Sequence, residues 1–234
     1  MASRLHILLF DVDGTLLLSG GAGGRALEEA FEALFGAAGA MEGVRAHGRT
    51  DALICADMFR NGLGREGTEE EIRRLLDRYL ERLPGAVAES ADYRLLPGIP
   101  EVLDALGERE DVALGLGTGN IERGARIKLE RGELNRYFPF GGFGSDAADR
   151  AGLIEAGFRR GEERSRERSP GAEIVRWVVG DTRLDVEAGR AAGARVVAVA
   201  TGGDSLEELA RAGPDHLFPD FAGGNGLPAL LDGG

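Results

Sequence analysis

The amino-acid sequence predicts an α/β fold in which a doubly wound parallel sheet carries an inserted helical unit. Short apolar runs rich in Val, Leu and Ile recur along the chain, and each is followed by Gly, Thr or Asp and then by a helical pattern. This alternation is typical of parallel strands that are covered by helices on both faces. A long, purely helical pattern separates the first run from the second, and it predicts the insertion.

Four apolar runs are the expected core strands: residues 5–10, 112–117, 174–179 and 195–200. In the insertion, apolar residues at helical spacing predict three helices, over residues 24–35, 51–62 and 68–83. Thr68 and Glu71 predict a capping box at the start of the third helix. No strand is expected there. We therefore expect a core of residues 1–17 and 93–234 and a helical cap domain of residues 18–92.

The composition excludes several classes of protein. A formal net charge of -12 argues against nucleic acid or an anionic membrane surface as the main partner. Cys55 is the only cysteine, so an intrachain disulfide or a multi-thiolate metal site is impossible. No apolar run approaches the roughly 20 residues of a membrane span, and no signal-peptide pattern is present. We expect a cytoplasmic protein that acts as a monomer or weak homodimer.

Acidic residues follow the expected strands. Asp11 and Asp13 interrupt the first apolar run in LLFDVDGTLL, although buried, unpaired carboxylates are costly and repel each other. Ligands of an open parallel sheet bind beyond the carboxyl ends of its strands, where Thr118, Asp181 and Asp185 also fall. Four carboxylates in one crevice need a cation, and Mg²⁺ takes carboxylate, water and phosphate oxygens. The sequence therefore predicts a metal-and-phosphate site.

The motifs DVDGT, LGTGN and GDTRLD, in this order and each after a strand, resemble those of the haloacid dehalogenase (HAD) superfamily of phosphotransferases. The helical insertion is similar to that family's first cap class, as in phosphoglycolate phosphatases and β-phosphoglucomutases. The resemblance covers essentially the whole chain. It implies a Mg²⁺-dependent phosphatase that hydrolyses a small phosphorylated metabolite through an aspartyl-phosphate. True haloacid dehalogenases lack the second acid because halide needs no protonation, so Asp13 favours phosphate chemistry.

The resemblance also implies a role for each motif residue. Asp11 would be the nucleophile that attacks phosphorus, and Asp13 would protonate the leaving oxygen and then deprotonate water. Thr118 would hydrogen-bond the phosphoryl oxygens as a catalytic residue, with Gly119 and Asn120 beside it at the substrate. The groups implied for Mg²⁺ are Asp11, the backbone carbonyl of Asp13, Asp181 and Asp185.

Members of this family carry a basic residue, usually Lys before Pro, between the second and last motifs, and this chain has no such Lys-Pro. Lys128, the only lysine, falls about ten residues down the helix after Thr118, or ~15 Å along, and we expect it not to serve. Arg150 is placed correctly, and a guanidinium can contact two oxygens together. We expect Arg150 to supply the charge; Arg159 and Arg160 are less well placed.

Other interpretations stay open. HGRTD at 47–51 falls where cap-class relatives carry a substrate-specificity loop, so Arg49 is a candidate for gripping the far end of the substrate. The alternative is a solvated arginine beside a helix cap at Thr50 or Asp51. For the whole protein, a phosphomutase of the same family would bind a second phosphate through the cap. A signalling receiver domain is another alternative, but such domains are far shorter than this chain. The missing lysine motivates a further alternative, a catalytically impaired protein that binds a phosphate ligand.

Overall fold

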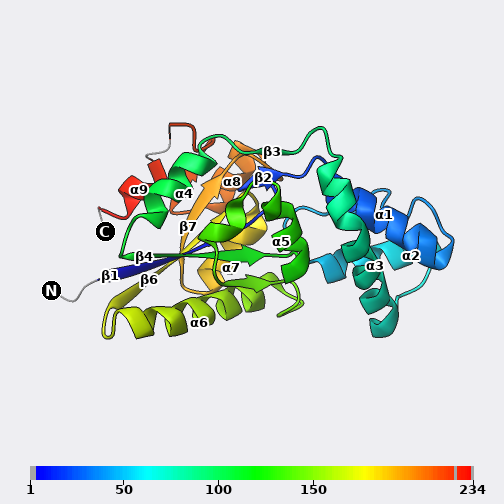
Figure 1. Cartoon of the computed structure of the whole chain (residues 1–234), viewed down its shortest axis with the longest axis horizontal. Helices are drawn as coiled ribbons and strands as arrows, with labels where there is room; N and C mark the ends of the chain where they lie inside the picture. Colours follow the sequence, from blue (N-terminus) through cyan, green and yellow to red (C-terminus); the bar gives the residue numbers. More distant parts are fainter. Residues whose placement is uncertain (1–3, 224–225, 233–234) are drawn as a thin grey trace.

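The computed structural model describes residues 4–223 and 226–232 and contains a six-stranded parallel sheet between layers of helices (Figure 1). Its strands are β1 (Arg4–Phe10), β4 (Val112–Thr118), β5 (Gly141–Phe143), β6 (Glu173–Gly180), β7 (Arg195–Val199) and β8 (His216–Phe218). The predicted α/β class is confirmed. Residues 1–3, 224–225 and 233–234, which the expected core includes, lie outside the described residues.

The order of the strands places β1 at the centre of the sheet. Neighbouring strands follow the order β5-β4-β1-β6-β7-β8, and every pair is parallel. The chain adds β4 and β5 on one side of β1 and then β6, β7 and β8 on the other side, so the direction of winding reverses beside β1. Phe10 pairs with Leu116 of β4 and with Val179 of β6, so these three strands end almost level. Residues that follow them therefore meet at one point.

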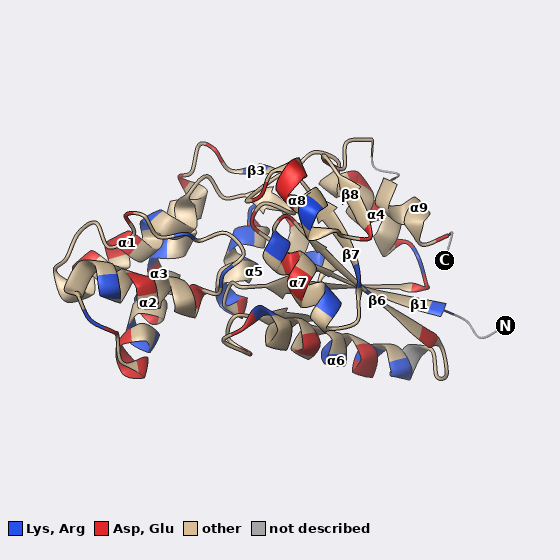
Figure 2. Cartoon of the chain, turned by 180° about the vertical axis from the view of Figure 1, so that it is seen from behind, with Lys and Arg blue, Asp and Glu red and all other residues tan. Residues whose placement is uncertain are grey.

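β1 is apolar apart from Arg4 and His6, because helices cover both faces of the sheet. Leu8 and Phe10 belong to one hydrophobic cluster, and Ile7 and Leu9 belong to another on the opposite face. Figure 2 shows charged residues mainly on the helices and loops, with the central strands almost free of them. The helices around the sheet are α4 (Ile99–Gly107), α5 (Glu122–Glu130), α6 (Arg150–Arg168), α7 (Arg183–Ala191), α8 (Leu206–Ala212) and α9 (Gly226–Leu230), with a 3-10 turn, η1 (Leu134–Tyr137).

Three further helices lie beyond the carboxyl ends of the strands (Figure 1): α1 (Ala22–Phe35), α2 (Asp51–Leu63) and α3 (Glu69–Ala88). They bury their own hydrophobic cluster, in which the rings of Phe31 and Phe59 lie 5.1 Å apart. The predicted capping box forms, since the Thr68 amide donates to Glu71 and the Glu71 amide to Thr68. Among the described helices, none combines the length and apolar character that a bilayer crossing requires. The domain limits at 18 and 92 stay a prediction.

The structure contains short strands that the sequence analysis missed. β2 (Leu17–Leu18) and β3 (Arg94–Leu95) form a small antiparallel pair where the chain leaves and re-enters the core. β8 is also too short for a periodic pattern to reveal. β5 lies within the aromatic segment YFPFGGFG at residues 137–144. Its Gly142 packs so closely that a β-carbon would lie 1.7 Å from the carbonyl oxygen of Leu153 on α6.

Candidate active site

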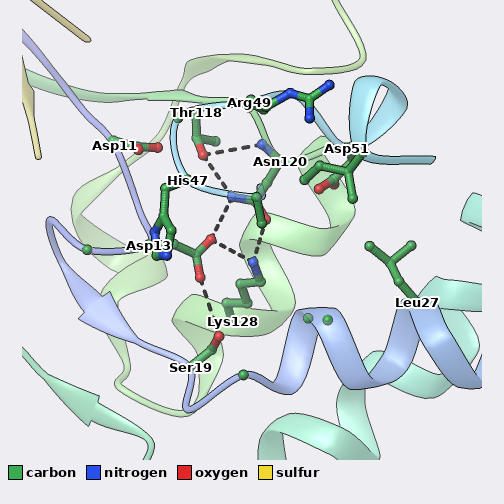
Figure 3. Close-up of a pocket in the computed structure, with 18 of the residues that line it drawn as sticks. Asp11, Asp13, Ser19, Leu27, His47, Arg49, Asp51, Thr118, Asn120 and Lys128 are labelled. Carbon is green, nitrogen blue, oxygen red and sulfur yellow. Dashed lines mark hydrogen bonds and ion pairs between the residues drawn. The ribbon is translucent and has the colours of Figure 1, made fainter. Parts of the chain in front are cut away.

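The structure brings the predicted acids together at the centre of the sheet. Asp11 and Asp13 follow β1, and Asp181 and Asp185 follow β6. Asp11, Asp181 and Asp185 are buried, and one carboxylate oxygen of each lies within 4.8 Å of the others. A buried set of three carboxylates fits a hard divalent cation such as Mg²⁺, which prefers oxygen ligands. The fourth acid, Asp13, turns toward Asn120 instead (Figure 3).

Burial makes two of the clustered carboxylates, those of Asp11 and Asp181, difficult to ionise. Burial, with the nearby Asp185, raises the pKa of Asp11 to about 6, although Arg150 acts in the opposite direction. Burial, Asp185 and Asp11 raise the pKa of Asp181 well above its usual value. A divalent cation would favour the ionised forms of both groups.

Gly14 allows the two acids after β1 to be aimed differently. It has a positive φ of 87°, a conformation that L side chains rarely adopt. A β-carbon at this position would also lie 2.3 Å from Oδ2 of Asp181. Asp181 is held in turn by a 2.9 Å hydrogen bond from the Thr15 hydroxyl. Only glycine therefore fits between Asp13 and the carboxylate cluster.

Arg150, the first residue of α6, lies in the cluster. Its Nη2 is 2.8 Å from Oδ2 of Asp11, and its Nε donates to Oδ1 of Asp185 at 2.9 Å. The side chain is only 8% exposed, so its charge acts through protein rather than solvent. Its Nη1 also donates to the carbonyl of Gly48, in the segment before α2. Arg160, one of the weaker candidates, instead pairs with Asp146.

Asp185 both caps the start of α7 and pairs with Arg150. Its Oδ2 accepts from the Thr182 amide at 3.0 Å, and the Thr182 hydroxyl accepts from the Asp185 amide, which completes a capping box. Its Oδ1 accepts from Arg150. Both carboxylate oxygens of this predicted metal ligand therefore have partners in the chain.

Lys128 lies in the site, so the expectation that it is out of reach is wrong. Its Nζ donates to Oδ2 of Asp13 and to Oδ1 of Asn120, both at 2.6 Å (Figure 3). The rise along α5 is not at fault. Side chains on a helix lean toward its N-terminus, so the long lysine side chain extends back over the preceding turn. Ile121, which caps α5, and Gly124 and Lys128 within α5 are spaced i, i+3 and i+7, so they lie on one face. This spacing could have indicated that Lys128 lies on the same side as the start of the helix that follows the second motif.

Asn120 connects the polar groups at this end of the cavity. Its Nδ2 donates to Asp13 and to the Thr118 hydroxyl, each at 2.9 Å. Loss of solvation acts to raise the pKa of Asp13, but Lys128 and the hydrogen bonds from Lys128, Asn120 and Ser19 hold that pKa below its usual value. The pKa of Lys128 is raised despite its burial, chiefly because Asp13 and Asp51 lie nearby. The Asp13–Lys128 pair is therefore ionised.

Replacing Lys128 by Met should raise the pKa of Asp13, because a side chain of similar length then lacks the charge that favours the carboxylate. We also expect kcat/KM to fall on the order of 10²-fold. Carboxyl-carbon NMR titration, with Asp13→Asn identifying the signal, measures the pKa directly. Lys128→Arg is the matched control, since it retains the charge. An unchanged Asp13 pKa in Lys128→Met would contradict this account.

Arg49 is oriented differently from the other candidates. Its guanidinium pairs with the carboxylate of Asp57 and donates to the carbonyl oxygens of Arg45 and Leu53. Its backbone, in contrast, lies against the second motif, because a β-carbon at Gly119 would be 2.1 Å from the Arg49 carbonyl oxygen. A role of the Arg49 side chain in binding substrate stays a prediction.

A cavity of about 350 Å³ lies between the sheet and the three added helices. Asp11, Asp13 and Arg150 line it on the side of the sheet, while Asp51, Ile54 and Tyr79 line it on the side of the helices. Its volume is at the lower end of the range for small-molecule sites. The clustered acids therefore face a space suited to a small ligand.

Comparisons with known proteins point to one family. A family model described as haloacid dehalogenase-like hydrolase matches residues 8–199. A phosphoglycolate phosphatase of Pseudomonas syringae pv. tomato is 28% identical over 232 residues, which cover 97% of this chain and 80% of the relative. The structure of CbbY from Rhodobacter sphaeroides in complex with phosphate covers 99% of this chain and 100% of its own, at TM-score 0.71 and 22% identity. A predicted phosphoglycolate phosphatase from Haemophilus somnus covers 97% and 98%, at TM-score 0.66 and 21% identity.

Proposed function

The chain belongs to the haloacid dehalogenase-like hydrolase family, and from that membership we propose that it is a Mg²⁺-dependent phosphatase of small phosphate monoesters. The relative named phosphoglycolate phosphatase supports the phosphatase class. The observation that carries the proposal is the buried Asp11 at the edge of the cavity, paired with Arg150 and adjacent to Asp181 and Asp185. A nucleophile, a cation and a candidate metal site thus meet in a space for a small ligand.

The proposed Mg²⁺ site consists of Asp11, Asp181 and Asp185, together with the backbone carbonyl of Asp13. Bound Mg²⁺ would supply positive charge beside the phosphoryl oxygens. Thr15 and the Gly203 amide hold Asp181 through its two carboxylate oxygens, and the capping box holds Asp185. These hydrogen bonds orient the acids before any ligand arrives, so little reorganisation is needed at the reaction.

The first chemical step uses Asp11 and Asp13. A carboxylate oxygen of Asp11 forms a bond to phosphorus while the bond between phosphorus and the leaving oxygen breaks. In the free enzyme Asp13 is a carboxylate, and it takes up a proton when the phosphate dianion enters the cavity, because the added negative charge favours the neutral carboxyl group. Asp13 then gives that proton to the leaving oxygen, and Lys128 and Asn120 stabilise the carboxylate that remains. Arg150 offsets the negative charge that gathers around Asp11.

In the second step Asp13 takes a proton from water, whose oxygen attacks phosphorus and releases Asp11. One inorganic phosphate and one alcohol leave for each water consumed. The pairing of Arg150 with Asp11 supports this enzyme over a binding protein, because the charge expected from the family's lysine is present. Transfer of the phosphoryl group to a sugar hydroxyl in excess of release to water would favour the phosphomutase instead.

Mg²⁺ should both stabilise the protein and permit turnover. At 100 times its Kd, a ligand that binds only the native state adds about 2.7 kcal/mol, which for a chain of this size raises Tm by roughly 5–10 °C. Phosphate release from a panel of monoesters should require Mg²⁺, and Asp181→Asn should lose both the release and the shift in Tm. Thermal unfolding and a phosphate assay, each with Mg²⁺ or with chelator, measure the two effects. Full activity in excess chelator would rule the proposal out.

A further inference from the structure

Asp51 is a buried carboxylate of the cavity wall that the catalytic steps do not use. It begins α2 and is 5% exposed. Its Oδ2 accepts from the Ile121 amide at 2.8 Å, but Oδ1 accepts no hydrogen bond from the described residues. Every fully enclosed side-chain polar atom of those residues has a hydrogen-bond partner, with the exception of Asn135 Oδ1. Because Oδ1 of Asp51 has no partner, it is not fully enclosed, and Asp51 lines the cavity.

The hydroxyl of Tyr79 is in the same situation on the neighbouring helix. Tyr79 extends from α3, is 1% exposed and lines the same cavity. No described residue hydrogen-bonds its hydroxyl, and the hydroxyl is not among the fully enclosed atoms that lack a partner. Buried hydroxyl and carboxylate groups normally find partners. Two polar groups of the described wall thus face a space where a ligand would satisfy them.

Gly23 leaves room for a ligand group beside them. A β-carbon at Gly23 would lie 3.4 Å from Nζ of Lys128 and 3.8 Å from the Tyr79 hydroxyl oxygen. These are ordinary contact distances, so an atom fits there without a clash. Gly23 lies in α1 without a positive φ, where alanine would favour the helix more. The backbone does not require this glycine, whereas a ligand in the cavity would.

The charges of this wall do not suit a second anion. The ammonium of Lys128 is already paired with Asp13, and Asp51 adds another carboxylate. The guanidinium of Arg49 is paired with the carboxylate of Asp57. Arg94 is exposed, and its guanidinium donates to the carbonyl of Asp92. A phosphate or carboxylate would meet the like charge of Asp51. A hydroxyl can donate to Asp51 and accept from Tyr79 or Lys128.

We propose that Asp51, Tyr79 and Lys128 form a subsite for a hydroxyl group on the leaving alcohol, so that the enzyme prefers hydroxylated phosphate monoesters to esters that carry a second anionic group. This inference rests on the proposed phosphatase function and concerns the same cavity. An alkyl ester leaves Asp51 and Tyr79 without partners, which is a costly state for buried polar groups. Sites that hydrogen-bond a substrate hydroxyl discriminate strongly against analogues that lack it.

The test is a matched series of two-, three- and four-carbon alkyl phosphates that end in a methyl, a hydroxyl or a carboxylate group. Phosphoglycolate is the two-carbon carboxylate. With Mg²⁺ present, we expect kcat/KM for the hydroxyl ester to exceed that for the methyl ester by roughly 10²-fold at the best chain length. The carboxylate ester of that length should be a poorer substrate than the hydroxyl ester.

Two substitutions test whether the preference for hydroxyl esters arises at this subsite. Asp51→Asn keeps an oxygen for the Ile121 amide but presents a donor to the cavity, so the carboxylate-to-hydroxyl ratio of kcat/KM should rise about tenfold. Gly23→Ala fills the subsite and should remove most of the hydroxyl advantage. Gly85→Ala is the matched control, because it makes the same change within α3 where a β-carbon meets nothing within 4 Å. Thermal unfolding verifies that each variant is folded.

The outcomes separate the two proposals. Methyl and hydroxyl esters hydrolysed equally well at every chain length would overturn the subsite and leave the phosphatase standing. A hydroxyl advantage that survives both Asp51→Asn and Gly23→Ala would also overturn it. Absence of turnover on all of these esters and on the wider monoester panel would overturn the phosphatase itself.

Discussion

Asp11→Asn is expected to lower kcat by on the order of 10⁴-fold or more, because the amide cannot form the covalent intermediate. The fold should survive. Asparagine has nearly the same shape, Arg150 keeps its contact with Asp185, and the repulsion between Asp11 and Asp185 disappears. Phosphate release measures the loss, and intact-mass analysis after rapid quenching should detect phosphorylated protein in the wild type alone.

Asp77→Asn is the matched control for this prediction. Asp77 is an exposed acid on α3, so the same change of charge there should leave kcat within about twofold of wild type. Substantial phosphatase activity in pure, folded Asp11→Asn protein would show that the nucleophile is another group. Phosphorylated Asp11→Asn protein would lead to the same conclusion.

Arg150→Ala is expected to lower kcat/KM by on the order of 10²-fold or more, the scale of losing one preorganised electrostatic partner. Its removal also leaves Asp11 and Asp185 buried without their cation. Breaking a buried ion pair in this way typically costs about 3–5 kcal/mol of unfolding free energy. Arg150→Lys should recover only part of the activity, because an ammonium lacks the planar fork that reaches both carboxylates. Steady-state kinetics and chemical denaturation measure the two losses.

Arg160→Ala is the control for Arg150, since it removes an arginine of the same helix that pairs with Asp146 at the surface. We expect its kcat/KM to stay within about threefold of wild type. Wild-type kinetics in Arg150→Ala, together with an inactive Arg160→Ala or Arg159→Ala, would mean that the required cation lies elsewhere. Activity unaffected by all three changes would remove the arginine from the mechanism.

Much of the site could be predicted because its residues follow strands. Asp11, Thr118 and Asp181 each come directly after or at the end of a strand, and parallel strands end at one edge. The apolar runs identify those strands locally, so the residues beyond them can be placed without knowledge of the packing. The short β5 and β8 escaped because three residues carry no usable periodicity.

The places of Lys128 and Asp51 in the site could not be predicted, because they depend on distances between elements that are far apart in the sequence. The ion pair of Lys128 with Asp13 joins α5 to the turn after β1, and the hydrogen bond from Ile121 to Asp51 joins the start of α5 to α2. Rise per residue measures distance along one helix, but it does not say what that helix packs against. A side chain that leans back toward the N-terminus shortens the distance further.

The sequence by itself determined the α/β class, the three helices of the insertion and the acids at the centre of the sheet, since periodicity and strand-end motifs are properties of local segments. Only the tertiary structure decided which cation meets which acid: Arg150 contacts Asp11, and Lys128 contacts Asp13. It also decided that the guanidinium of Arg49 pairs with Asp57 and that Asp51 and Tyr79 face the cavity. The physical reason is that charge pairing and hydrogen bonding act over a few ångströms, and those distances are set by how α5 packs against α3 and how α6 packs against the sheet.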